Sequence, residues 1–436
     1  MSIVGPETAA WFERAYASLV NGVSSGWRYW GRHDTLVIAR GEGAHVYDSD
    51  GKRYIDYHCG FGPIILGHAD PKVAAAVTEA VSTGTTYAFT QEREIVAAET
   101  FKKAVPWVEK LRFTNTGTEA TMHAIRLARG FTGRDVVVKF EGTYHGAHDY
   151  VMYSTPGKPV ESMGSAYGPI PLPMSSGMPN TIGTLILTLP FNDVAAVRRL
   201  FADHGRRIAA LVVEPMLGNA MGIQPAPGFL AELRALCDAE GSVLVFDEVK
   251  TGFRIATGGA AEVYGVVPDL GTFAKAMGNG VPVAAIAGRG EILEGWAKGG
   301  IVQAGTYSGN SIAAAAATAT IGELLTGAPM ARIATAGTAI MEGTSKILAA
   351  QGVPHSVQGQ PGMFGFFLGE GSVSDYRATD GHDADLYERL VMAMIERGVM
   401  PSPDALEPWF LCSAISDDDV ATTLEVFEES LKVALA

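Results

Sequence analysis

The chain has 436 residues, of which 47% are hydrophobic and 18% are charged, and its formal net charge at pH 7 is −14. This composition is that of a globular protein large enough for two or three domains. Its basic residues are not clustered, so it lacks the electrostatic footprint of a protein that binds nucleic acid or an anionic membrane. We therefore expect a small-molecule ligand.

The N-terminal and cysteine patterns predict a cytoplasmic protein. Glu7 and Glu13 interrupt the N-terminal stretch, so we expect no signal peptide, and no apolar run is long enough to predict a transmembrane helix. Cys59, Cys237 and Cys412 are widely spaced and fit neither a disulfide framework nor a zinc site. We expect them to be reduced thiols.

Short β-branched or apolar runs alternate with helical patterns, which predicts a largely parallel sheet covered by helices. Near the N-terminus, LVIA, HVYD and RYIDY are expected to be short strands. The expected strands of the main sheet are KLRF (110–113), DVVVKF (135–140), IAALVVE (208–214), SVLVFDE (242–248), LGTFAK (270–275) and VPVAAIAG (281–288). The clearest expected helices cover residues 120–131, 228–241, 311–325 and 383–398.

These elements divide the chain into three expected regions. Residues 1–70 form an N-terminal segment, residues 71–328 a large α/β domain, and residues 329–436 a C-terminal domain that again mixes helices and strands. The helix expected over 228–241 ends in Gly241, which suits the left-handed position that stops a helix.

Polar residues follow the carboxyl ends of several expected strands. In open parallel sheets, ligands bind outside these ends. KLRF is followed by TNTGTEA, DVVVKF by EGTYHGAHD, IAALVVE by PMLGN, SVLVF by DEVK, and LGTFA by Lys275. Five strands therefore end in residues that can share one pocket.

The stretch NTGTEA (115–120) places Gly117 and Thr118 at a strand-to-helix turn. Free backbone N–H groups and the helix dipole favour an anion such as phosphate there. By itself the pattern is also explained by a helix cap, in which Thr116 or Thr118 acts together with Glu119.

The stretch YHGAHD offers two histidines and one aromatic side chain. His145 and His148 could suggest a metal pair, but no third ligand with a suitable spacing accompanies them, so we expect no metal. Tyr144, taken alone, is typical of a packed or half-buried aromatic residue.

Asp247 ends an apolar run, and a buried carboxylate without a positive partner is strongly unfavourable. Lys275 lies in the apolar stretch LGTFAKAMGNG. A desolvated lysine has a lowered pKa that suits imine formation, although an isolated lysine more often lies at the surface. Combined with a phosphate-binding turn, these residues predict pyridoxal 5′-phosphate (PLP), whose pyridinium would pair with Asp247 and whose aldehyde Lys275 would hold as a Schiff base.

Motifs along nearly the whole chain resemble the class III aminotransferases, which are fold type I PLP-dependent enzymes, and most closely their glutamate-1-semialdehyde 2,1-aminomutase branch. The motifs are IARGEGAHVYDSDGKRYIDY (38–57), GPIILGHADPKV (62–73), FTNTGTEATMHAIRLARG (113–130), EGTYHGAHD (141–149), PMSSGMP (173–179), VVEPMLGN (212–219), FDEVKTGFR (246–254), PDLGTFAKAMGNG (268–280) and GTYSGN (305–310).

The resemblance implies an α/β fold. A mostly parallel central sheet would form the large domain, and the N- and C-terminal segments would together build a smaller α/β domain. It also implies a homodimer with active sites at its interface and a ping-pong reaction between an amino donor and an oxo-acid acceptor through pyridoxamine phosphate.

The family pattern also implies roles for individual residues. Lys275 would be the Schiff-base lysine and proton shuttle, and Asp247 the partner of the pyridine nitrogen. The other implied cofactor contacts are Val249 and Tyr144 on the two ring faces, His145 beside Tyr144, Gly117 and Thr118 at the phosphate, Thr306 at the phosphate from the neighbouring subunit, and Glu214 and Asn219 as support for Asp247 and the ring oxygen.

Two further residues match substrate contacts of the aminomutase branch. Arg28, in NGVSSGWR, stands where an arginine receives the substrate carboxylate, although a surface arginine explains the same position. Glu407, in DALEPWF, matches a substrate-facing glutamate.

Three positions depart from the aminomutase pattern. Phe61 stands where that branch has tryptophan, Lys250 where it has methionine, and GNG (278–280) where it has GGG. We therefore expect a transaminase acting on a carboxylate-bearing amine or amino acid and a 2-oxo acid, with the aminomutase as the first alternative. A PLP-dependent isomerase or decarboxylase on the same fold is a second alternative, and a non-catalytic binding protein a third.

Overall fold

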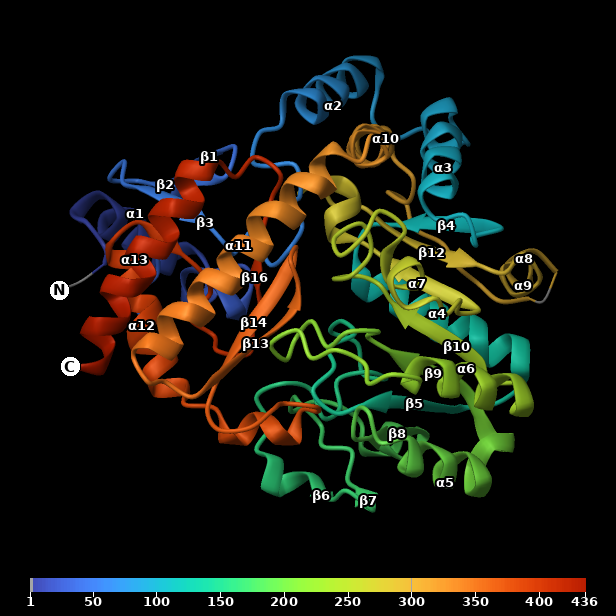
Figure 1. Cartoon of the computed structure of the whole chain (residues 1–436). Coiled ribbons are helices and arrows are strands. Elements are labelled where there is room, and N and C mark those ends of the chain that lie inside the picture. The colour runs from blue at the N-terminus through green and yellow to red at the C-terminus, as the bar shows by residue number, and fades with distance from the viewer. Residues whose placement is uncertain (1–2, 299) are drawn as a thin grey trace.

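The structure is a computed structural model that describes residues 3–298 and 300–436. In Figure 1, the strands of a large sheet lie on one side of the molecule, and the N- and C-terminal elements lie together on the other side. The two ends of the chain are therefore neighbours in space, although the large sheet separates them in the sequence.

Among the described residues, the largest sheet has seven strands in the order β4-β12-β11-β10-β9-β5-β8. Strand β12 runs antiparallel to both of its neighbours, and the other pairs are parallel, which confirms the predicted mostly parallel sheet. The strands are Lys110–Thr114 (β4), Val136–Phe140 (β5), Ile186–Leu189 (β8), Ile208–Val213 (β9), Val243–Asp247 (β10), Leu270–Phe273 (β11) and Ala284–Gly288 (β12).

Helices cover both faces of this sheet. Alternate side chains of β5 point in opposite directions: Val137 packs with helix α4 (Gly117–Thr132), whereas Val136 and Val138 pack with α5 (Val194–His204) and α6 (Phe229–Glu240). Because both faces are covered, the central strands are apolar runs rather than alternating patterns. Helix α6 ends at Gly241 in the left-handed conformation, as predicted.

The N- and C-terminal segments share a second sheet. It joins β1 (Ile38–Glu42), β2 (His45–Asp48) and β3 (Arg53–Asp56) to β15 (Val399–Met400), which pairs in parallel with β3. This pairing agrees with a smaller domain built from both ends of the chain. The boundaries near residues 70 and 328 stay predictions.

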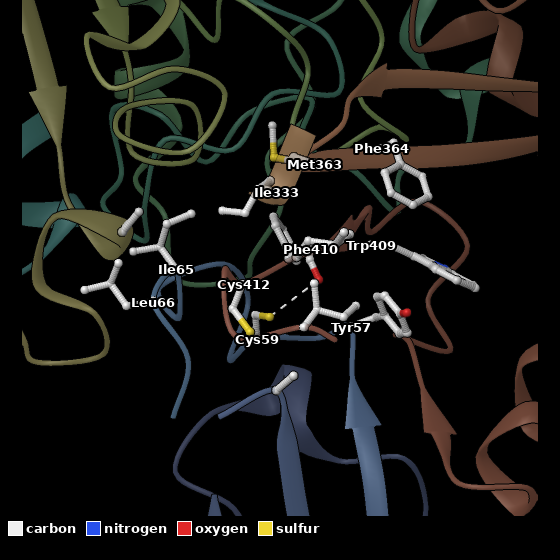
Figure 2. Close-up of a cluster of buried hydrophobic side chains, with 14 of the residues drawn as sticks. Tyr57, Cys59, Ile65, Leu66, Ile333, Met363, Phe364, Trp409, Phe410 and Cys412 are labelled. Carbon is white, nitrogen blue, oxygen red and sulfur yellow. Dashed lines mark hydrogen bonds between the residues drawn. The ribbon is translucent and has the colours of Figure 1, made fainter. Parts of the chain in front are cut away.

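A buried cluster links the same two segments (Figure 2). Tyr57, Cys59 and Ile65 from the N-terminal segment pack there with Trp409 and Phe410 from the C-terminal segment. The neighbouring strands are β13 (His355–Gln360), β14 (Met363–Leu368) and β16 (Trp409–Phe410), and a separate short pair is β6 (Gly164–Ser165) and β7 (Gly168–Pro169).

The remaining helices lie around these sheets. They are α1 (Pro6–Ser18), α2 (Pro71–Thr83), α3 (Glu92–Ala104), α7 (Gly259–Tyr264), α8 (Gly290–Leu293), α9 (Gly295–Lys298), α10 (Ser311–Leu324), α11 (Ala328–Ala350), α12 (Ala384–Glu396) and α13 (Asp417–Leu435). Within residues 3–298 and 300–436, no single helix is long and apolar enough to cross a membrane. Helices α10 and α11 pass that test only as a pair, with a bend of 68° between them.

Two details of the sheet differ from the sequence prediction. Strand β8 was not predicted, because its four residues directly follow a short 3-10 helix and offer no long apolar run. Strand β11 ends at Phe273, so Lys275 lies beyond the strand, at the start of a 3-10 turn (Lys275–Gly278), with a φ of 49°. The lysine is therefore carried by a tight turn that leaves the sheet.

Candidate active site

A cavity of about 150 Å³ lies at the carboxyl ends of β4, β5, β9, β10 and β11. Each of the five strand ends that the sequence singled out contributes to its wall. The lining residues are Gly117, Thr118, Tyr144, His145, Gly146, Glu214, Asn219, Asp247, Val249, Lys250 and Lys275. The structure thus brings together all the predicted cofactor contacts except Thr306.

The carboxylate of Asp247 is buried and held by three neighbours. Its Oδ2 lies 2.7 Å from Nδ1 of His145, and its Oδ1 accepts hydrogen bonds from the hydroxyl of Thr272 (3.0 Å) and the amide of Val249 (3.1 Å). Thr272 is in place because the β10–β11 register sets it opposite Asp247. These contacts fix the direction in which the carboxylate faces the cavity.

The amino group of Lys275 donates a hydrogen bond to the carbonyl oxygen of Phe61, at 2.8 Å. Burial, together with the nearby positive charge of Lys250, lowers the pKa of Lys275 to about 7. A substantial part of the Lys275 amine is therefore neutral near pH 7, and the neutral amine is the form that attacks a carbonyl carbon.

The turn before helix α4 has the features of an anion site. Gly117 and Thr118 are the first residues of the helix, so their N–H groups have no acceptor within it. The hydroxyl of Thr116 accepts a hydrogen bond from the amide of Glu119 (3.1 Å), so the capping role considered from the sequence is also present. This cap does not use the amides of Gly117 and Thr118, and both residues line the cavity.

Gly146 allows the loop after β5 to approach this turn. A Cβ atom at Gly146 would lie 2.6 Å from Oγ1 of Thr118, and its φ of +98° also favours glycine. The next residue, Ala147, donates its amide hydrogen to the same Oγ1, at 3.2 Å. The loop that carries Tyr144 and His145 is therefore joined directly to the anion site.

Glu214 connects the loop after β5 with the loop after β9. Its carboxylate accepts hydrogen bonds from the amide of Tyr144 (2.7 Å), the amide of Gly218 (2.9 Å) and the side-chain amide of Asn219 (3.0 and 3.1 Å). Burial raises the pKa of Glu214. These hydrogen bonds orient Asn219 and Tyr144, and within residues 3–298 and 300–436 none of them joins Glu214 to Asp247.

A larger cavity of about 450 Å³ adjoins the first and shares four residues with it, namely Tyr144, Asn219, Lys250 and Lys275. Much of the rest of its wall is aromatic or otherwise apolar. The other lining residues are Ser25, Gly26, Trp27, Tyr29, Trp30, Phe61, Ala147, Met152, Thr155, Pro156, Met174, Ser402, Pro403, Asp404 and Glu407. A substrate that reaches Lys275 has space there.

Arg28 and Thr306 lie outside both cavities. Arg28 is exposed and does not line the larger cavity, whereas its neighbours Trp27 and Tyr29 do. Thr306 lines a separate open cavity with Phe89 and Gly309. The substrate role of Arg28 and the contribution of Thr306 to a neighbouring subunit stay predictions.

The sequence analysis missed several residues that shape the site. The carbonyl of Phe61 accepts a hydrogen bond from Lys275, and the hydroxyl of Thr272 donates one to Asp247. Close to Lys275 in the sequence, the side chain of Asn279 bonds to the backbone of residues 65–67. Lys139 is fully buried beneath the loop after β5, where it donates to the carbonyls of Thr143 and Tyr153. A lysine inside the apolar run DVVVKF was a signal for this role.

A family model described as "Aminotransferase class-III" matches residues 29–431. The chain belongs to the class III aminotransferases. A glutamate-1-semialdehyde 2,1-aminomutase from Anaeromyxobacter sp. (strain Fw109-5) is 42% identical over 398 residues, which cover 91% of each chain. The resemblance found in the sequence motifs is thereby confirmed.

Solved structures of transaminases have a similar fold. An omega-transaminase from Sphaerobacter thermophilus has a TM-score of 0.93 and 32% identity, with 99% of this chain and 98% of that chain covered. A transaminase solved with PLP bound has a TM-score of 0.89 and 26% identity, with 99% of both chains covered. These matches confirm the predicted fold type I architecture.

This class III aminotransferase is a PLP-dependent enzyme. The described residues fit the cofactor: the lowered pKa of Lys275 suits a carbonyl, the buried carboxylate of Asp247 suits a pyridinium, and the free amides at Gly117 and Thr118 suit a phosphate. In the described part of the chain, the buried Nε2 atom of His145 also has no hydrogen-bond partner, as expected where a ligand completes a polar site.

Proposed function

We propose that this enzyme is a transaminase that moves an amino group between a carboxylate-bearing amine or amino acid and a 2-oxo acid, with pyridoxamine phosphate as the second form of its cofactor. The main support is the ion pair between Lys250 and Glu407. Lys250 stands where the aminomutase branch has methionine, and it bonds both carboxylate oxygens of Glu407, at 2.8 and 2.9 Å. The aminomutase pattern implies that Glu407 faces the substrate. A glutamate with both carboxylate oxygens bound by Lys250 is not free to do so.

The residues of the site would divide the work as follows. PLP, when bound, supplies an electron sink for the carbanion formed at the substrate carbon. Lys275 would hold the cofactor and then carry a proton to and from that carbon, for which a pKa of about 7 is suited. Asp247, oriented by His145 and Thr272, would keep a positive charge at the pyridine nitrogen.

The other predicted contacts would position the cofactor. Gly117 and Thr118 would bind the phosphate with their free amides, and Val249 and Tyr144 would pack on the two ring faces. Asn219, held by Glu214, would meet the ring oxygen.

A glutamate-1-semialdehyde 2,1-aminomutase is the second candidate, because the relative with that name is 42% identical over 91% of the chain. An aminomutase must retain its intermediate while each of its two nitrogens in turn reacts with the cofactor, whereas a transaminase releases its first product before the acceptor enters. An isomerase or decarboxylase of the same fold would also use Lys275 and Asp247, but it would not leave the enzyme in the pyridoxamine form.

The predicted homodimer is part of the same proposal. Thr306 lies beside the strongly exposed side chains of Phe89 (85%) and Tyr307 (63%), and such side chains are typical of a surface that a partner covers. A partner subunit bound there would allow Thr306 to reach the neighbouring phosphate. The cytoplasmic location expected from the sequence stays a prediction.

Half-reactions test the reaction type. The PLP-loaded enzyme is mixed with a panel of amines and amino acids while the visible absorption of the cofactor and the free oxo product are measured. We expect a suitable donor to yield stoichiometric oxo product and a 2-oxo acid to restore the absorption. Efficient conversion of glutamate 1-semialdehyde to 5-aminolevulinate, without exchange into added oxo acids, would instead establish the aminomutase.

A further inference from the structure

Lys250 and Glu407 form a largely buried ion pair in the wall of the larger cavity. The Lys250 side chain is 7% exposed and the Glu407 side chain 12%. The ammonium of Lys250 donates to both carboxylate oxygens of Glu407 and to the carbonyl of Gly218, at 2.8 Å. An ammonium has three N–H donors, so these contacts use all of them.

Both partners are held in place by different parts of the fold. Lys250 follows Asp247, the last residue of β10, by three residues. Glu407 lies in the C-terminal segment, where its amide donates to the carbonyl of Asp404. The Lys250 ammonium also lies 5.5 Å from the ring centroid of Phe410, so an aromatic face supports its charge.

The pair presents no net charge to the cavity. Among the described residues, Lys250 and Lys275 are the basic side chains in the wall of the larger cavity. Lys275 is the residue proposed above to hold the cofactor. The other acidic group of that wall is Asp404, whose pKa is raised by burial. A carboxylate placed against the pair would therefore find no free cation and would be repelled by Glu407.

We propose that Lys250 is a specificity-determining residue whose charge is masked by Glu407, so that the part of the substrate lying against this pair is uncharged. This inference rests on the proposed transaminase function and refines its substrate class. Glu407 occupies the position that a substrate carboxylate would otherwise take on Lys250. The carboxylate that the proposed substrate carries must then lie at another side of the cavity.

The surrounding wall agrees with an uncharged substituent. Trp27, Trp30, Phe61 and Met152 line the same cavity, and these side chains favour apolar or aromatic groups. Such a substituent could pack beside the paired charges without breaking any of the three hydrogen bonds to Lys250.

The test compares the wild-type enzyme with E407Q, K250M and the double variant K250M/E407Q. Each is assayed with matched pairs of amino donors, 4-aminobutanoate and 5-aminopentanoate against their carboxamides. The measured quantity is the ratio of kcat/KM for the carboxylate to kcat/KM for the carboxamide. The double variant removes both charges and controls for the loss of the pair itself.

E407Q leaves the charge of Lys250 unmasked, so we expect it to raise the ratio by about ten-fold or more, as one charge-assisted contact allows. K250M leaves Glu407 alone and should lower the ratio, while the double variant should return close to the wild type. A purely structural role would reduce activity with both donors and would not move the ratio in opposite directions. An unchanged ratio in E407Q, or equal shifts in both single variants, would overturn the proposal.

A binding measurement keeps the test independent of turnover. Titration of glutarate into the PLP-loaded proteins, followed by calorimetry, should show tighter binding to E407Q than to the wild type, K250M or the double variant. Equal binding to E407Q and the double variant would overturn the proposal, because the dicarboxylate would then bind elsewhere. Absence of turnover by the wild type with any amine would count against the transaminase function. The glutarate titration would still test whether Glu407 masks the charge of Lys250.

Discussion

The Nδ1 atom of His145 lies 2.7 Å from the Oδ2 atom of Asp247, and both side chains are buried. His145 comes from the loop after β5 and Asp247 from the end of β10, so the contact joins two of the strand ends that form the cofactor cavity. It holds the carboxylate in one orientation, which is what a group needs if it is to meet a pyridine nitrogen at a fixed place.

Replacement of Asp247 should separate cofactor binding from catalysis. We expect D247N to retain part of its PLP and to lose turnover by about 10² to 10³-fold, because the asparagine brings no negative charge to the pyridinium. Cofactor content and kcat are the measurements. As a comparison, T272V removes one hydrogen bond to Asp247 and should cost much less. Turnover of D247N within a few-fold of the wild type would show that Asp247 is not the ring partner.

Chemical trapping should identify the lysine that carries the cofactor. Borohydride reduction of the PLP-loaded enzyme, followed by peptide mapping, is expected to place the phosphopyridoxyl group on Lys275. Lys250 also lines the cavity, but its ammonium is fully engaged by Glu407 and Gly218, whereas burial lowers the pKa of Lys275 to about 7. A label on Lys250 would refute the assignment.

The predicted role of Arg28 is open to a kinetic test. R28A is expected to raise KM for carboxylate-bearing substrates by about ten-fold, with little effect on simple amines, because one charge-assisted contact is lost. Arg28 is exposed and outside the cavity wall of the single chain, so R14A, which removes another basic side chain near the N-terminus, is a suitable control. Equal KM values for R28A and the wild type would show that Arg28 does not contact the substrate carboxylate.

Arg254 should be a major contributor to stability. It is fully buried, and its guanidinium donates to the carbonyls of Gly62, Ile64, Gly362 and Leu411. These hydrogen bonds join the N- and C-terminal segments to the turn after β10. We expect R254M to lower the free energy of unfolding by about 3 kcal/mol or more, since it leaves buried carbonyls without donors.

The urea midpoint of PLP-loaded R254M is the measurement. R198M is the matched control, because Arg198 bonds Glu232 on the surface, and it should leave the midpoint nearly unchanged. A midpoint of R254M equal to that of R198M would contradict the expectation.

Buried Lys139 should make stability depend on pH. Burial lowers its folded-state pKa to about 7, whereas an unfolded lysine titrates near 10.4. Between about pH 7 and 10.4 the unfolded chain therefore binds the extra proton, and the contribution of Lys139 to the free energy of unfolding should rise by up to about 1.4 kcal/mol per pH unit. Well below pH 7 both states bind the proton and this contribution is flat.

Urea unfolding of the wild type and K139M across that pH window tests the assignment. K139M should lack this rise, while K346M, which replaces a lysine exposed on helix α11, should keep the wild-type slope. Identical slopes for the wild type and K139M would mean that Lys139 does not titrate as described.

The sequence by itself determined the local structure and the family. Apolar runs such as IAALVV predict strands because both faces of a parallel sheet are buried, and the ends of these runs indicated where polar residues would gather. The motifs around Asp247 and Lys275 are contiguous, so a family resemblance and a cofactor could be inferred from them without coordinates.

Only the tertiary structure decided which distant groups meet. His145 and Asp247 are 102 residues apart, Lys250 and Glu407 are 157 apart, and Lys275 meets the carbonyl of Phe61 from 214 residues away. Such contacts depend on strand order and register and on how the N- and C-terminal segments cross, and these arise from packing of the whole chain. For the same reason, the sequence could suggest a substrate-facing role for Glu407, which stays a prediction, but could not reveal that Lys250 holds both of its oxygens.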